Sequence, residues 1–166
     1  MDCEELYGYK NRLMEEMCKN PEIVRLVTGR DDPQMPAFDL PYTNIFPFER
    51  VPDTADDAKT FVCFDIDIDS VPTKTTYFLT LYVWVFTHES KLRLPRGQGV
   101  LIDQMVAAIV RMLNGSRVYG QGELKLASVK GFVPVESYLG RMVAFKTSDF
   151  NLGEKKPVPV NRKAGL

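Results

Sequence analysis

The segment from Thr75 to His88 constrains the fold most, because its side chains alternate as they do in a strand and yet both sets are apolar. A strand of this kind needs cover on each face of its sheet. Helices of the same chain can supply one layer, but a small domain has little left for the second. We therefore expect a neighbouring subunit or a ligand to cover the second face. The two sets are Tyr77, Leu79, Leu81, Val83 and Val85 on one side and Phe78, Tyr82, Trp84 and Phe86 on the other.

Three further segments have the alternation of strands. Between Thr60 and Asp69, four apolar side chains alternate with one cysteine and three aspartates, which predicts a strand with one buried and one polar face. Glu123 to Val129 and Gly140 to Thr147 alternate as well, and we expect them to close the sheet as two more strands.

Three helices are predicted from apolar residues at three- and four-residue steps. The first runs from Glu4 to Lys19; the second follows Asn20-Pro21, an N-cap with proline at the first helical position, and ends at Gly29. The main helix runs from about Gln98 to Asn114, with a buried stripe formed by Leu101, Met105, Ala108, Ile109, Met112 and Leu113. Together these elements predict an α+β fold: a mixed, mostly antiparallel sheet of four or five strands, packed by one main helix with the N-terminal helices beside it.

A proline-rich loop is predicted at about 30–57, because five prolines there lack the backbone donor that a central strand or helix needs. So long a connection is uncommon inside a compact domain unless it performs a function. Its strongly apolar stretch is Ile45-Phe46-Pro47-Phe48. We therefore interpret the loop as a docking arm, with Phe46 and Phe48 as partner-binding residues.

Length and patterning predict one domain, residues 1–151, followed by a basic tail, 152–166. The tail has almost no apolar periodicity, so we expect it to be mobile until a partner orders it. An acidic protein surface, or DNA held in a channel, would suit its cations. The predicted partner-binding residues of the tail are Lys155, Lys156, Arg162 and Lys163.

Composition argues against several functional classes. Lys and Arg number 21 against 22 Asp and Glu, so the net charge of -1 gives no overall attraction to nucleic acid or to an anionic membrane. The three cysteines are far apart and contain no CxxC pair, so we expect a reducing compartment and neither a disulfide framework nor a zinc site. The first residues are acidic where a secretory signal is basic, and no apolar run approaches the roughly 18 residues of a membrane span. No membrane partner is expected.

Candidate catalytic groups are few. His88, the only histidine, lies at a strand end without a recognisable nucleophile motif, and a structural role is predicted for it. Asp65, Asp67 and Asp69 follow one another at about 6.5 to 7 Å along their strand, which is too wide for all three to bind one ion. Two of them could share a water-bridged magnesium, but we expect an acidic face, solvated or turned to another subunit, with cations nearby.

One enzyme hypothesis stays open. Asp65, Glu123 and Lys125 resemble the acidic residues and lysine of metal-dependent nucleases, since Glu123 and Lys125 share one face of a strand. A Glu-x-Lys pair also occurs by chance on exposed strands. The main prediction is a protein that is not an enzyme and has no catalytic, metal or cofactor-binding residues.

Seven segments of the sequence contain distinctive turn and core residues. They are Asn20 to Val27, Ile45 to Thr54, Leu81 to His88, Arg96 to Asp103, Met112 to Gly115, Gly120 to Gly122, and Gly140 to Asn151. In this order, over about residues 5–151, the segments resemble those of small structural proteins of long-tailed bacteriophages, and within that group the chain is similar to tail terminator proteins. The resemblance implies a two-layer α+β subunit, a hexameric ring and no cofactor. Because the segments contain turn and core residues, they say more about fold and assembly than about any site.

The function that this resemblance implies is virion assembly. A tail terminator ring caps the tail tube and joins it to the head–tail connector. The implied partners are therefore further copies of the chain, the tail tube protein and the connector or head-completion protein, with DNA passing through the channel. The implied location is the tail or neck of the virion, and the host cytoplasm during assembly. A head-completion or connector role in the same neck is the close alternative.

Overall fold

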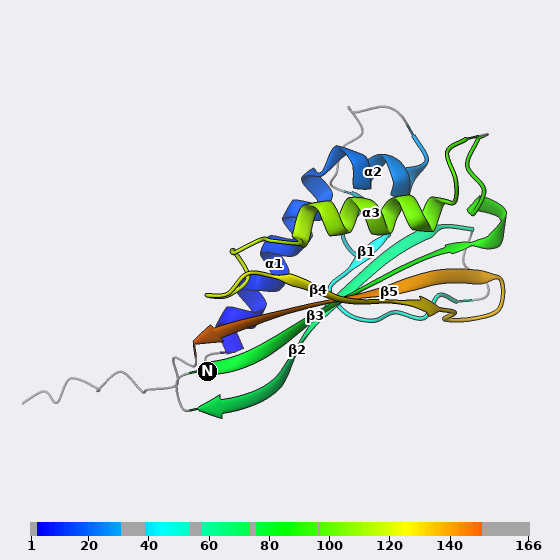
Figure 1. The fold of residues 1–166 in the computed structure, drawn as a ribbon. Coiled ribbons are helices and arrows are strands. Elements are labelled where there is room, and N and C mark those ends of the chain that lie inside the picture. The colour runs from blue at the N-terminus through cyan, green and yellow to red at the C-terminus, as the bar shows by residue number, and fades with distance from the viewer. Residues whose placement is uncertain (1–2, 31–38, 54–57, 74–75, 96, 151–166) are drawn as a thin grey trace, which may run out of the picture.

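The structure is a computed structural model of the chain, and it describes residues 3–30, 39–53, 58–73, 76–95 and 97–150. Within these ranges, helices pack on one face of a five-stranded sheet, so the predicted α+β class is confirmed (Figure 1). The helices are α1 (Cys3–Lys19), α2 (Pro21–Thr28), the short 3₁₀ helix η2 (Glu89–Lys91) and α3 (Leu101–Leu113). The strands are β1 (Ile45–Phe46), β2 (Thr60–Thr73), β3 (Thr76–His88), β4 (Lys125–Phe132) and β5 (Tyr138–Phe150).

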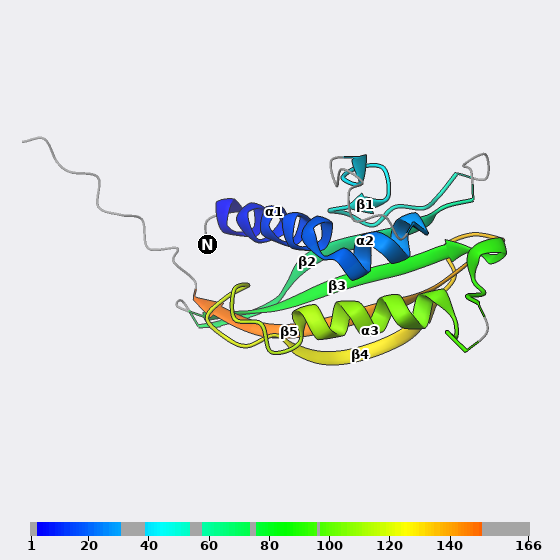
Figure 2. The same ribbon diagram turned by 90° about the horizontal axis from the view of Figure 1, so that it is seen from above.

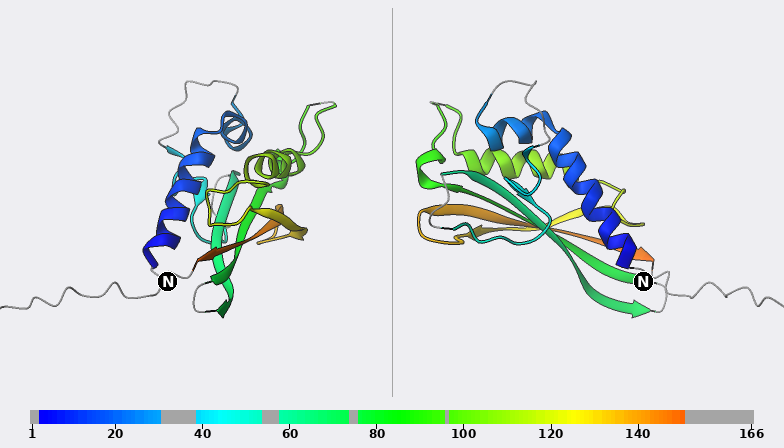
Figure 3. Two further views of the ribbon diagram at one scale, coloured as in Figure 1. Left: turned by 60° about the vertical axis from the view of Figure 1, so that its left-hand side comes forward. Right: turned by 180° about the vertical axis from the view of Figure 1, so that it is seen from behind.

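The sheet has the order β1-β2-β3-β5-β4. Neighbouring strands are antiparallel except β1, which runs parallel to β2 with Ile45 opposite Val62. The sheet twists strongly beneath the helices (Figure 3). Its mixed, mostly antiparallel character is as predicted, and β1 and β4 form its two opposite edges (Figure 2).

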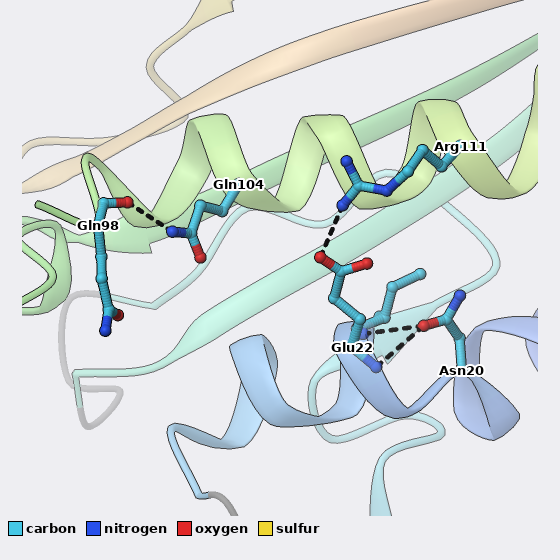
Figure 4. A network of polar contacts seen from close by, with 6 residues as sticks. Asn20, Glu22, Gln98, Gln104 and Arg111 are labelled. Atoms are coloured by element: carbon cyan, nitrogen blue, oxygen red, sulfur yellow. Dashed lines mark hydrogen bonds and ion pairs between the residues drawn. The ribbon is translucent and has the colours of Figure 1, made fainter.

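The helix boundaries follow from local capping. The Asn20 side chain accepts hydrogen bonds from the backbone N–H groups of Glu22 and Ile23, and Gly29 ends α2 at a φ of 67°. The ion pair between Arg111 and Glu22, 2.6 Å long, joins α3 to α2 (Figure 4). The main helix begins at Leu101, later than the predicted Gln98, because Gly99 has a φ of 77° and Val100 is extended.

The main core lies between the helices and the sheet. The predicted stripe of α3 is buried there except for Met112, which is half-buried. None of the helices in the ranges given above is long and apolar enough to cross a membrane. Fully buried side chains of this core include Leu13, Met17, Ile23, Phe64, Tyr77, Met105, Ile109 and Phe145.

A second apolar cluster covers the other face of the sheet near the His88 end of β3. This cluster confirms that β3 is apolar on both faces. The residues that cover the second face of β3 here come from the same chain, so the expectation that a neighbouring subunit or a ligand covers it is wrong at this end. Burial of Phe61 and Cys63 likewise corrects the polar second face expected for β2. The buried members are Phe46, Phe61, Cys63, Trp84, Phe86 and Tyr138, with Tyr82, Phe132, Val135 and Met142 packed against them.

Candidate functional site

The acidic row lies on β2, and cations approach both of its ends. Lys10 of α1 forms an ion pair with Asp65, 2.5 Å from Nζ to Oδ1, and Lys146 of β5 lies 4.0 Å from Asp69. The hydroxyl of Thr80 donates a hydrogen bond to Asp69. The prediction that cations lie near the acidic row is therefore confirmed. Among the residues that the structure describes, no group of three His, Cys, Asp or Glu side chains could hold a metal ion.

The proposed nuclease residues are not brought together. β3 and β5 lie between β2, which carries Asp65, and β4, which begins at Lys125. At about 4.8 Å per strand, these two strands are roughly 14 Å apart. Glu123 instead forms an ion pair with Arg117, 3.4 Å long. A carboxylate pair that shares one metal ion is not formed by these side chains.

His88 has the structural role expected of a histidine at the end of a strand. It is the N-cap of η2, where its Nδ1 accepts a hydrogen bond from the backbone N–H of Ser90 and lies 2.8 Å from the hydroxyl oxygen of that serine. Its ring contacts Tyr138 edge to face, with 5.4 Å between centroids. These contacts fix the turn that follows β3.

The apolar stretch of the proline-rich loop adds strand β1 to the sheet and packs on its second face. Phe46 is 4% exposed and contacts the rings of Phe48 and Phe61, while the guanidinium of Arg50 lies 4.6 Å from the centre of the Phe46 ring. Phe48 is 45% exposed. Of these two predicted partner-binding residues, Phe48 presents a surface in the isolated subunit and Phe46 lies in its core. The tail residues Lys155, Lys156, Arg162 and Lys163 lie outside the described residues.

Sequence reasoning missed the exposed edge formed by β4. We expected this segment to close the sheet, but Leu126 is 40% and Val129 43% exposed. A register shift between Leu126 and Ser128 places both apolar side chains on the helix-facing side, opposite Phe145 and Val143. Leu126 and Val129 are three residues apart, which does not fit the two-residue period of a strand unless a bulge lies between them. This spacing is the signal in the sequence that indicates the bulge.

A partly buried network of tyrosines and carboxylates joins α1 to the sheet. Asp149 of β5 accepts a hydrogen bond from the hydroxyl of Tyr9, and the Tyr77 hydroxyl lies 3.4 Å from Asp149 and 3.1 Å from Glu5. In the same way Tyr119, in the connection after α3, donates to Glu16 at 2.6 Å. Burial is the main cause that raises the pKa of Tyr9, Tyr77 and Tyr119 above the ordinary value of 10.0, and the neighbouring carboxylates raise it further.

We expect the folded protein to lose stability steeply as the pH rises above about 10, the ordinary pKa of tyrosine. The raised pKa values mean that the unfolded chain releases protons which the folded chain retains. The three tyrosines therefore stabilise the fold fully below pH 10, and this contribution is lost as the pH rises towards their pKa values in the folded protein. Thermal unfolding followed between pH 8 and pH 11.5 measures this loss. Tyr119→Phe should flatten the dependence, and a melting temperature that stays constant across this range would contradict it.

The comparisons with known proteins give one family. The model of the YomW family matches residues 20–147, a span that includes α2, α3 and most of the sheet. No curated protein matches the chain. The family's name suggests a phage-derived gene, which agrees with the phage origin that the sequence resemblance implies. Since the match covers well over half of the chain, the protein belongs to the YomW family.

Proposed function

We propose that this protein is a structural component of a phage tail, a tail terminator that assembles into a hexameric ring, caps the tail tube and joins it to the head–tail connector. Membership of a family with a phage-derived name supports the phage context. The α+β subunit, with helices on one face of a mixed sheet, is the kind that the resemblance implies.

The observation that carries the proposal is the open β4 edge. β4 pairs with β5 on one side, six of its eight residues are exposed, and the two that remain are half-buried. An edge strand of this length offers backbone donors and acceptors to another chain. The apolar Leu126 and Val129 add contact area that a monomer leaves in water. A subunit with such an edge is suited to repeated association.

In this function the partners are further copies of the chain, the tail tube protein and the connector, and the protein belongs to the tail or neck of the virion. The cations at Lys155, Lys156, Arg162 and Lys163 would contact an acidic partner surface or the DNA in the channel. A ring contacts the DNA that passes through it by way of the DNA phosphate charges, and such contacts require no catalytic group in the protein.

Negative-stain images of the purified protein, and of phage particles that carry it with an affinity tag, test this function. We expect rings with a central channel, and tag label at the neck end of the tail. In parallel, incubation with DNA and Mg²⁺ or Mn²⁺ should leave the DNA intact. DNA cleavage that Asp65→Asn abolishes would instead favour the nuclease, and label at a site remote from the neck would contradict the tail terminator role.

A further inference from the structure

Seven of the twelve large apolar side chains that the described residues expose lie on two surfaces at opposite edges of the sheet. We call Lys125–Phe132 together with Val133 and Leu139 the β4 surface; its four exposed apolar side chains, Leu126, Val129, Val133 and Leu139, are 40 to 65% exposed. The 39–53 surface comprises the described residues around β1, and exposes Tyr42, Phe48 and Val51 by 45 to 65%. The strand order places these two surfaces at opposite edges (Figure 2).

A cleft of about 340 Å³ extends the β4 surface towards the start of α3. Val100, Phe132, Val133 and Leu139 contribute apolar walls, and the ion pair between Asp103 and Arg141, 3.6 Å long, is part of its lining. Its size is at the lower end of the range of protein pockets, so it can accept a protruding side chain. The β4 surface thus ends in a cleft that has apolar walls and one ion pair.

The two surfaces carry opposite charge. β4 contains no acidic residue and exposes Lys125 and Lys130. The 39–53 surface exposes Asp39, Glu49 and Asp53, while its one cation, Arg50, is half-buried over the rings of Phe46 and Phe61. Complementary potentials of this kind fix the register of an interface and disfavour wrong partners.

The same charges disfavour symmetric pairing of two β4 edges. Two antiparallel copies of β4 would bring the lysines of both chains together, and lysine on an edge strand is a known way to prevent such pairing. A contact between two different surfaces, by contrast, leaves one free surface on each copy, so it repeats from subunit to subunit and closes into a ring when the rotation permits.

From these observations we infer that the β4 surface of one copy packs against the 39–53 surface of the next copy and forms the seam of the ring. The inference rests on the proposed ring and names the contact that builds it. Apolar side chains of both edges are buried at the seam, and the lysines of β4 face the acidic residues of the neighbour.

Two charge-reversed proteins test the seam. The first carries Lys125→Glu and Lys130→Glu, so both of its surfaces are acidic; the second carries Asp39→Lys and Glu49→Lys, so both are basic. All four positions are exposed, and unchanged melting temperatures will verify folding. Lys19→Glu, at an exposed position of α1 outside both surfaces, is the control for reversal of a surface charge; it also removes the ion pair of Lys19 with Glu15, so its melting temperature is measured in the same way. Mass photometry across a concentration series gives the assembly state of each.

We expect each charge-reversed protein alone to assemble about tenfold or more weakly than the wild type, because like charges meet at every seam. A mixture of the two should recover rings in which the variants alternate, since every seam then joins an acidic surface to a basic one. The seam would be overturned, with the wild-type ring left standing, if either variant assembled as well as the wild type. It would also be overturned if both variants failed to assemble and mixing them did not restore rings. A wild type that is monomeric at every concentration would overturn both the seam and the ring.

Discussion

Gly140→Ala is expected to lower the free energy of unfolding by about 3 kcal/mol, because an added methyl group has no space at this position of β5. A Cβ there would lie 2.2 Å from the carbonyl oxygen of Val85 and 2.7 Å from the Cβ of Phe86. Both residues belong to β3, the strand that pairs with β2 on one side and β5 on the other, so its backbone cannot yield without disturbing the sheet. A loss of this size lowers the melting temperature by roughly 6 to 12 °C in a chain of this length.

Gly131→Ala is the matched control. Gly131 lies in the neighbouring strand β4, and a Cβ there meets no atom within 4 Å. We expect this variant to melt within a few degrees of the wild type, since restricting an unstrained glycine costs nothing in the folded state. Equal melting temperatures for the two variants would show that the close approach of β5 to β3 is not a constraint on the fold.

Phe46→Ala is expected to destabilise the isolated subunit by about 3 kcal/mol, as removal of a buried phenylalanine does. The ring is 4% exposed and joins β1 to the cluster on the second face of the sheet. Its loss leaves a cavity beside Phe61 and removes the surface over which the Arg50 guanidinium lies. Urea unfolding of the subunit, under conditions where it is monomeric, measures this change.

Phe48→Ala provides the comparison, because its ring contacts Phe46 but is 45% exposed. We expect it to cost about 1 kcal/mol or less in subunit stability and to weaken assembly, since Phe48 belongs to the 39–53 surface. Should Phe46→Ala leave the subunit as stable as the wild type and weaken only assembly, Phe46 would be a docking residue, as the sequence alone predicts.

The elements set by local signals could be predicted from the sequence. Asn20-Pro21 and Gly29 bound α2 because capping depends on residues within one turn of the helix. The alternation of β3 correctly predicts a strand that is apolar on both faces. The start of α3 was placed too early because two glycines with positive φ, Gly97 and Gly99, hold the preceding residues in a turn.

The features that depend on distant pairing could not be predicted. β1 has two residues, too few for any period, and it is a strand only because β2 lies beside it. The bulge in β4 places Val129 on the helix-facing side of the sheet, where Leu126 also lies, and nothing local to that strand shows that its edge stays open. The residues of the nuclease hypothesis do not meet for the same reason, since the strand order sets Asp65 apart from Lys125.

Self-assembly is tested most directly by the solution mass of the full-length protein at micromolar and higher concentration, alone and mixed with tail tube protein. Mass photometry or light scattering coupled to gel filtration gives that mass. We predict a closed multimer, six times the 18.9 kDa subunit, that persists on dilution and binds the end of the tube. A single species of 18.9 kDa under every one of these conditions would contradict the ring.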